Sequence, residues 1–185
     1  MEKFIMITSN TGKYQIARDI FRKYNLELIQ ATIELPELQD YDVVKVSKYS
    51  AVFAANTLGK PVIKSDIGYY IDELGGFPGA YVKHINQMLK PDDILKMMEH
   101  KRNRKILLKE CLTYAHPNGN VKQFVSEEEA HLSKFAMGRG TTFDKIIVLD
   151  GFDRPKGIYD YQTNVKHFKD NLTIYDEMAK YLIKE

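Results

Sequence analysis

The chain has 185 residues, of which 44% are hydrophobic and 28% are charged, and these proportions are typical of a soluble globular protein with a continuous core. Its 27 basic and 25 acidic side chains leave a net charge of +2, which is too small to indicate a nucleic-acid or membrane partner. The single cysteine, Cys111, excludes an internal disulfide, and its apolar neighbours favour a buried, inert thiol. We expect a single domain over residues 1–185, with no nucleic-acid and no membrane partner.

The first predicted elements are a strand and a helix. Residues 4–7 form an apolar run that predicts a central strand, and the run is too short for a signal peptide or a membrane span. Hydrophobic side chains then recur at helical spacing between Ile16 and Tyr24. This N-terminal pattern leads us to expect a cytoplasmic protein.

A polar, glycine-containing loop, residues 8–13, joins this strand to the helix. The positive end of the helix and its backbone N–H groups would face a ligand over the loop, and Lys13 adds a mobile cation there. This arrangement suits a phosphate, although the Walker spacing of P-loops is absent. A helix cap at Ser9 or Thr11 explains the same composition, so both interpretations stay open.

The next elements place an acidic loop between a strand and a helix. Residues 26–31 predict a second strand, and residues 42–58 have the hydrophobic spacing of a helix. Between them, Pro36 should hold Glu37 in an extended segment. Glu37 and the later Asp66 could share a hard cation such as Mg²⁺, which prefers oxygen ligands.

The most specific pattern surrounds Asp66. Residues 61–63 predict a short buried strand that ends near Asp66, where a carboxylate is well placed for chemistry. The glycine- and aromatic-rich segments 68–70 and 74–81 suit tight turns with positive φ better than a regular element. The alternative is that Asp66 caps a turn and that the glycines form a hairpin.

The middle of the chain predicts two helices and a hairpin. Residues 82–89 and 92–100 read as short helices. Residues 106–115 predict a long strand, and a strong turn signal leads into its partner at residues 121–125. The acidic triplet at residues 127–129 favours a solvated strand edge.

The last third of the chain combines a loop, a strand and a closing helix. Residues 138–144 form a second flexible loop, and residues 146–149 predict a buried strand. From about residue 164 to residue 184, hydrophobic side chains that include Leu172 predict a single helix. His167 near its start could lie beside a ligand, although a lone histidine there is more often structural.

Strands and helices alternate along the chain, with a hairpin inserted late. This order predicts an α/β or α+β architecture around a mixed sheet. Ligands bind beyond the carboxyl ends of strands in open α/β sheets. Four polar side chains could converge there: Asn10, Lys13, Glu37 and Asp66.

With these residues in view, the sequence resembles the inosine triphosphate pyrophosphatase family, the non-canonical purine nucleoside triphosphate pyrophosphatases. Residues 8–13 are similar to the family's Thr-Gly-Asn-x-x-Lys phosphate loop. Residues 34–37 and the later Lys48 are similar to its acidic loop and helix lysine. Residues 65–68 and 74–81 resemble its Asp-Ser/Thr-Gly and Leu-Gly-Gly-x-Pro-Gly-x-Tyr signature, which is the most specific of the three.

The resemblance implies a two-lobed α/β fold in which helices flank a mixed β-sheet with a central active-site cleft, usually in a homodimer. It also implies Mg²⁺-dependent hydrolysis of a nucleoside triphosphate to the monophosphate and pyrophosphate. Glu37 and Asp66 would hold the metal, and Asp66 would also orient or deprotonate the attacking water. The residues that the resemblance assigns to the substrate are Thr8, Asn10, Lys13, Lys48, Phe143, Asp144 and His167.

Three departures from the family pattern concern charge and base recognition. Ser65 stands where the family has an acidic residue just before the catalytic aspartate. Residues 141–145 keep an aromatic residue and the acid but lose the first, base-stacking phenylalanine. Residues 162–168 keep the histidine but lose the family's base-reading arginine and phosphate-side lysine. Three cations could replace the missing ones: Arg139, Lys145 and Lys166.

The sequence therefore predicts a nucleoside triphosphate pyrophosphatase whose substrate is a non-canonical or modified purine nucleotide such as ITP, dITP or XTP. Loss of a hydrogen-bonding arginine should alter base discrimination more than hydrolysis. The alternative is a nucleotide-binding regulatory protein that has kept the fold with little or no turnover. Ser65 and the altered base-reading motifs favour that alternative.

Overall fold

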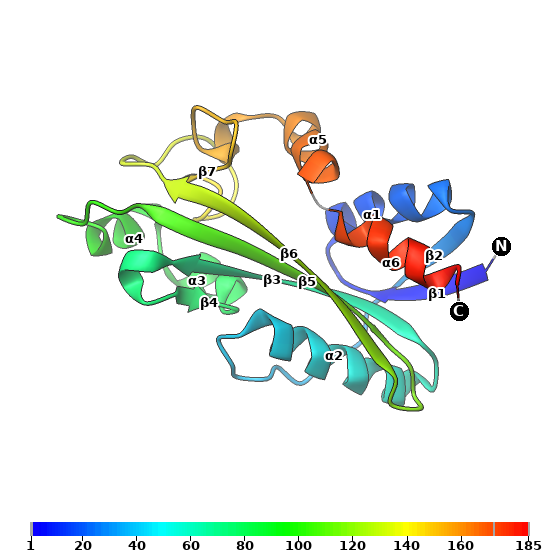
Figure 1. The fold of residues 1–185 in the computed structure, drawn as a ribbon. Helices are drawn as coiled ribbons and strands as arrows, with labels where there is room; N and C mark the ends of the chain where they lie inside the picture. Colours follow the sequence, from blue (N-terminus) through cyan, green and yellow to red (C-terminus); the bar gives the residue numbers. More distant parts are fainter. Residues whose placement is uncertain (1, 172, 185) are drawn as a thin grey trace. The chain divides into compact units, whose positions relative to one another are not determined.

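The computed structural model describes residues 2–171 and 173–184 (Figure 1). The chain forms two compact units. The first unit comprises Met1–Asp66, Glu110–Ser126 and Lys169–Glu185, and the second comprises Ile67–Lys109 and Glu127–Phe168. The strand order along the hydrogen-bonded sheet is β2-β1-β3-β5-β6-β7, and β4 pairs with β3.

The first unit begins with a parallel three-stranded arrangement. Strand β1 (Glu2–Ile7) pairs with β2 (Leu26–Ala31) along its whole length and with the start of β3 (Val62–Ile71). Helix α1 (Thr11–Lys23) connects β1 with β2, and α2 (Val43–Leu58) connects β2 with β3. These elements lie where the sequence predicts them, and Asp42 caps α2 by accepting a hydrogen bond from the Val44 N–H group.

Two hydrophobic clusters cover opposite faces of the sheet in the first unit. Ile63 of β3 belongs to a cluster with buried residues of α1 and of α6 (Ile174–Leu182), which lies beside α1 (Figure 1). The preceding residue, Val62, packs instead with Ala51, Ala54 and Ala55 of α2. Because successive side chains of a strand point to opposite faces, the register of β3 decides which helix each of its residues meets.

The second unit contains the rest of β3 and a hairpin. Strand β4 (Phe77–Gly79) pairs antiparallel with the end of β3, and the connection includes Gly75 and Gly76 with φ of 62° and 87°. Helices α3 (Val82–Met88) and α4 (Pro91–Met97) follow. The alternative that the glycines form a hairpin is therefore correct for residues 74–81, and positive φ is confirmed at Gly75, Gly76 and Gly79, whereas Gly68 lies within β3 without positive φ.

Strands β5 (Lys105–Ala115) and β6 (Val121–Leu132) contribute residues to both units. In the second unit, β6 pairs antiparallel with β7 (Ile147–Val148), and α5 (Tyr161–Asn171) follows a short loop region. The expected hairpin of β5 and β6 is confirmed, with a longer second strand. No helix in the described part of the chain is long and apolar enough to cross a membrane.

Two predictions about element boundaries are wrong. Strand β3 does not end at Asp66 but continues to Ile71, so Asp66 lies within a ten-residue strand. The closing segment is not one helix but two, α5 and α6, since Thr173 separates them. Leu172, which the sequence places in a continuous helix, lies outside the described residues.

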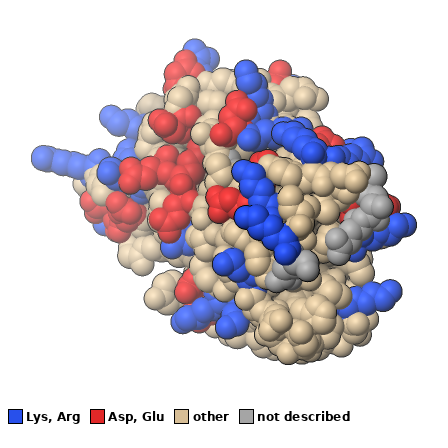
Figure 2. All heavy atoms as spheres, turned by 45° about the vertical axis from the view of Figure 1, so that its right-hand side comes forward, with Lys and Arg blue, Asp and Glu red and all other residues tan. Residues whose placement is uncertain are grey.

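Charged side chains of both signs lie side by side on the face drawn in Figure 2. This distribution agrees with the small net charge of +2. Any recognition of an anion must therefore come from particular side chains rather than from the field of the whole molecule.

Candidate active site

The loop between β1 and α1 is held by its own side chains. The Thr8 hydroxyl accepts a hydrogen bond from the Asn10 N–H group at 3.0 Å. The Asn10 side chain accepts one from the Lys13 N–H group, also at 3.0 Å, and so forms the N-cap of α1. The alternative of a cap at Ser9 or Thr11 is therefore wrong. The cap fixes the exposed start of α1, from which the Lys13 side chain extends.

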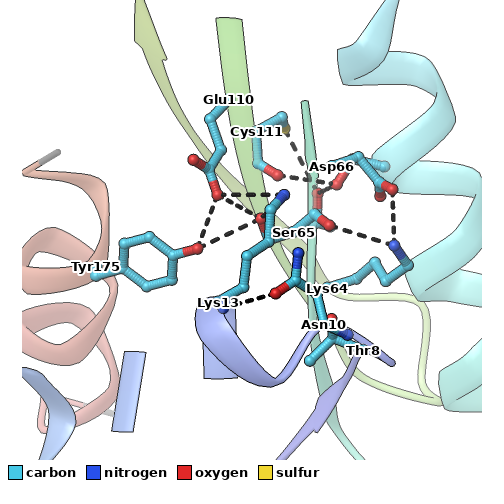
Figure 3. Close-up of polar contacts among 11 residues, drawn as sticks. Thr8, Asn10, Lys13, Lys64, Ser65, Asp66, Glu110, Cys111 and Tyr175 are labelled. Atoms are coloured by element: carbon cyan, nitrogen blue, oxygen red, sulfur yellow. Dashed lines mark hydrogen bonds and ion pairs between the residues drawn. The ribbon is translucent and has the colours of Figure 1, made fainter. Parts of the chain in front are cut away.

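Lys13 reaches a polar cluster on β3, β5 and α6 (Figure 3). Its ammonium group donates to the Ser65 hydroxyl at 3.2 Å and lies 3.7 Å from the Glu110 carboxylate. Ser65 donates to the same carboxylate oxygen, Oε1, at 2.5 Å. The Tyr175 hydroxyl donates to it at 2.7 Å. The Oε1 atom of Glu110 thus accepts hydrogen bonds from two hydroxyl groups and forms an ion pair with the Lys13 ammonium group.

This cluster is largely shielded from solvent. Glu110 is 5% exposed, and burial of an isolated charge would be costly without the ammonium group of Lys13. Burial is the main cause that raises the pKa of Tyr175 well above its ordinary value, and the charge of Glu110 is the second. The tyrosine therefore stays protonated near neutral pH and acts as a hydrogen-bond donor.

Asp66 points away from this cluster, toward the α2 side of β3 (Figure 3). Its Oδ1 atom forms an ion pair with the Lys64 ammonium group at 2.7 Å. Its Oδ2 atom is buried and has no hydrogen-bond partner among the described residues. A buried polar atom without a partner is rare in native proteins, and an ion or water commonly explains one. This oxygen therefore fits a metal ligand.

Glu37, the second expected metal ligand, and Lys48, an expected triphosphate ligand, are both exposed. Glu37 lies in the extended segment that precedes α2, and Lys48 lies on α2 itself. Within residues 2–171 and 173–184, no three histidine, cysteine, aspartate or glutamate side chains form a group able to enclose a metal ion. A metal here would therefore take few protein ligands.

A buried polar network holds α2 against the sheet. The Ser47 hydroxyl lies 2.8 Å from the Thr113 hydroxyl and donates to the Cys111 carbonyl at 3.2 Å. Gln123 donates to Thr113 at 3.0 Å and to the Val44 carbonyl at 3.0 Å. The expectation that Cys111 is buried is confirmed, and burial raises the pKa of its thiol. The network fixes the helix that carries Lys48.

The residues expected to contact the base lie in the second unit, and Asp144 among them is paired with Lys156. The two side chains form an ion pair of 2.8 Å, and Thr141 donates two hydrogen bonds to the other carboxylate oxygen. Phe143 is fully buried, with its ring at 5.1 Å from that of Tyr69 in an edge-on arrangement. These contacts tie residues 141–144 to the body of the second unit.

Electrostatics favours the charged forms of this ion pair. Burial alone would raise the pKa of Asp144, but the charge of Lys156 and the hydrogen bonds of Thr141 outweigh burial and lower it. Burial would lower the pKa of Lys156, and the interactions with Tyr69 and Asp144 raise it instead. Lys156 is thus a buried cation in this region that the sequence interpretation did not identify.

His167 of α5 is paired with Glu128 at 2.6 Å. Both side chains are mostly buried, and the Phe152 ring lies edge-on to the imidazole at 5.0 Å. The interpretation of residues 127–129 as a solvated edge is therefore wrong for Glu128. Its neighbour Glu127 is half-exposed and pairs with Lys109 at 2.6 Å.

Sequence reasoning missed Glu110 and Tyr175, which complete the cluster around Lys13. The signal for Glu110 was its place in β5, where Leu108 and Leu112 occupy the same face at a period of two. A lone carboxylate on the buried face of a strand requires a partner. The partner, Lys13, is distant in sequence and could not be identified from this pattern.

Comparison with known proteins identifies the family. A sequence model of the Ham1 family matches residues 4–160. The "dITP/XTP pyrophosphatase" of Methanopyrus kandleri is 32% identical over 152 residues, covering 82% of this chain and 81% of that protein. The protein of the same name from Methanosarcina acetivorans is 32% identical over 140 residues, covering 76% of each chain.

Solved structures show the same fold. The Ham1 protein of Staphylococcus aureus superposes with a TM-score of 0.80 at 17% identity, covering 99% of both chains. The HAM1 protein of Coxiella burnetii gives 0.81 at 16% identity, covering 100% of both chains. These matches confirm the α/β fold with a mixed sheet flanked by helices, and the family match confirms the resemblance seen in the motifs. The chain belongs to the Ham1 family.

Proposed function

We propose that this protein hydrolyses non-canonical purine nucleoside triphosphates, with dITP, XTP and ITP as the expected substrates. Relatives named dITP/XTP pyrophosphatase, about 30% identical over most of the chain, support this proposal. The observation that carries it is the buried Oδ2 atom of Asp66, which lacks a hydrogen-bond partner among the described residues. A carboxylate oxygen in this state is suited to a metal ion or an attacking water.

The triphosphate would bind at the start of α1. The hydrogen bonds of Thr8 and Asn10 fix this helix end, and the helix dipole favours an anion there. Lys13 would exchange part of its contact with Glu110 for the phosphates, and exposed Lys48 on α2 would contribute a second cation. We propose these four residues as the triphosphate site.

Asp66 and Glu37 are the proposed ligands of Mg²⁺. This ion binds through one or two carboxylates and keeps waters and substrate phosphates as its other ligands, so it needs no group of three side chains. Lys64 occupies Oδ1 of Asp66 and leaves Oδ2 for the metal or the water. When bound, Mg²⁺ would offset the negative charge that develops on the phosphates.

The reaction adds water across the anhydride bond between the α- and β-phosphates. It yields a nucleoside monophosphate and pyrophosphate. Asp66 would orient the attacking water, and Lys13 and Lys48 would stabilise the charge on the departing pyrophosphate. Positioning and charge neutralisation are the main tasks of the protein in such a displacement.

Base selection would involve Phe143, Asp144 and His167. Asp144 and His167 are already paired with Lys156 and Glu128, which supports a role in shaping the base side rather than in proton transfer. We further propose that the protein acts as a cytoplasmic homodimer, as the family resemblance implies.

The test is pyrophosphate release from canonical, deaminated and modified triphosphates, with and without Mg²⁺. We expect turnover of dITP and XTP that requires Mg²⁺ and that Asp66→Asn lowers by about 100-fold or more. Asp92→Asn, which removes an exposed carboxylate from α4, should leave the rate unchanged. If the wild-type protein hydrolyses none of the panel, the proposal is wrong.

A second candidate is nucleotide binding without turnover. The ion pair between Lys64 and Asp66 favours it, since a cation already satisfies part of the carboxylate that the reaction needs. Thermal stabilisation by dITP without pyrophosphate release would support this candidate. Rapid release would exclude it.

A further inference from the structure

Glu110 is a buried carboxylate that the proposed chemistry does not use. It lies on the buried face of β5, where its same-face neighbours Leu108 and Leu112 are hydrophobic. Burial of an ionised carboxylate is unfavourable unless a cation and hydrogen bonds compensate it. Here two hydroxyl groups and the Lys13 ammonium group provide that compensation.

The carboxylate of Glu110 adjoins position 65. Its Oε1 atom lies 2.5 Å from the Ser65 hydroxyl, and that residue precedes Asp66 on β3. A carboxylate at position 65 would therefore lie against that of Glu110. Two carboxylates in such contact cannot both be ionised without a large cost. The Lys13 ammonium group thus faces one buried carboxylate at this place, that of Glu110 on β5.

We infer that Glu110 is a positioning residue for Lys13, and that it supplies from β5 the negative charge that an acidic residue at position 65 would otherwise supply. The inference rests on the proposed function, because Lys13 is assigned there to the triphosphate. It gives a physical reason why Ser65 is compatible with an active site.

Glu110 acts through Lys13 rather than on the substrate. The lysine side chain is a flexible four-carbon stem that is 24% exposed, so it needs an anchor to hold its ammonium group in one place. Ser65 and Glu110 together provide this anchor. Tyr175 of α6, the helix beside α1, donates a hydrogen bond that orients the carboxylate. Loss of the charge would leave the lysine present but poorly placed for the leaving pyrophosphate.

The experiment moves the carboxylate from position 110 on β5 to position 65 on β3. Three variants are made in the 185-residue chain, Glu110→Gln, Ser65→Asp and the double variant Ser65→Asp/Glu110→Gln, with Glu129→Gln as a matched control. Glu129 is an exposed carboxylate on the neighbouring strand β6, paired with Lys105 at 3.8 Å. The measurements are kcat and KM for dITP with Mg²⁺, together with the melting temperature.

Each single variant should lower kcat about tenfold, because one lacks the charge and the other has two carboxylates in contact. The double variant should recover kcat to within about threefold of wild type, because it again has one carboxylate. Glu129→Gln should match wild type. The inference is overturned if Glu110→Gln keeps the wild-type kcat or if the double variant is no better than the poorer single variant.

A second measurement separates this inference from the proposed function. Inorganic tripolyphosphate, added without metal, should raise the melting temperature of the wild type and the double variant more than that of Glu110→Gln. If the wild type releases no pyrophosphate but shows this pattern, the proposed function fails and the positioning of Lys13 stands. Equal stabilisation of all variants, or none of the wild type, overturns the inference whatever the enzyme assay gives.

Discussion

Asp144 and Lys156 form one ion pair, yet their removal should have unequal costs. The Lys156 side chain is 10% exposed, whereas that of Asp144 is 28% exposed. In Asp144→Asn, the buried ammonium group loses its anionic partner but keeps the Tyr69 hydroxyl at 3.4 Å and the rings of Tyr69 and Phe168. Losing one partner of a buried pair costs about 3 to 5 kcal/mol, and the aromatic contacts offset part of this loss. We expect a loss of about 3 kcal/mol.

In Lys156→Met, the remaining Asp144 carboxylate is better compensated than the Lys156 ammonium group is in Asp144→Asn. The Asp144 carboxylate keeps both hydrogen bonds from Thr141, and its greater exposure lets water compensate the missing ammonium group. Methionine fills most of the volume that the lysine stem occupied. We expect this variant to lose about 1 to 2 kcal/mol. The double variant should be at least as stable as Asp144→Asn, because it removes the isolated buried cation.

Urea unfolding followed by circular dichroism measures these differences. For a chain of this length, a loss of about 3 kcal/mol corresponds to a fall of about 6 to 12 °C in melting temperature. Since the folded-state pKa of Asp144 is lowered, its stabilising effect is present above the unfolded value of about 3.9 and is lost as the pH falls through the folded value. The advantage of wild type over Asp144→Asn should therefore hold from about pH 5 to 9 and shrink below about pH 4.

The opposite order of stabilities would refute this reasoning. If Lys156→Met is less stable than Asp144→Asn, the buried ammonium group does not depend on the carboxylate. If the double variant is less stable than Asp144→Asn, the lysine contributes through packing rather than through charge. A constant difference down to pH 2 would exclude the lowered pKa of Asp144 as its source.

Two further predictions concern the first unit. Asn10→Asp should keep the helix cap and the folding stability but weaken binding of tripolyphosphate, because it adds a negative charge at the loop. Asn10→Ala should weaken binding and also lower the free energy of unfolding in urea by about 1 kcal/mol. Equal binding of tripolyphosphate by both variants and wild type would contradict a phosphate at this loop. The Cys111 thiol is buried and has a raised pKa, so it should not react with a thiol reagent at pH 8 in the native protein and should react fully in 6 M guanidinium. A rapid reaction of the native protein would show that the interior near Ser47 and Thr113 opens.

The sequence predicts the first elements well because their signals are local. Hydrophobic spacing is sufficient to find β1, α1, β2 and α2, although the cap of α1 is Asn10 rather than the expected Ser9 or Thr11. The prediction fails at β3, where glycine was taken as evidence for a loop. A Cβ atom at Gly68 would lie 2.8 Å from the Tyr70 ring, so this glycine permits close packing of an aromatic side chain within a strand.

The site residues likewise fall into those that a local motif predicted and those that depend on tertiary packing. Asn10, Lys13 and Asp66 were found because each belongs to a short motif. Glu110 was missed because its partner is far along the chain, and tertiary packing alone brings the two together. Lys156 was missed for a different reason, since its position in a single 3₁₀ turn, Lys156–Ile158, gave no sequence signal that its side chain would be buried.

Strand alternation explains how the site separates its charges. Ser65 points toward α1 and α6, where Lys13 is paired with Glu110, and the adjacent Asp66 points toward α2, where it is paired with Lys64 (Figure 3). Each of these buried or half-buried charges thus has a partner before any ligand arrives. In the proposed function, the phosphates would approach Lys13 and a divalent cation would approach Asp66, while Glu110 would keep its hydrogen bonds from Ser65 and Tyr175. Under that proposal, two local ion pairs rather than an extended basic surface would meet the anion, in agreement with the net charge of +2.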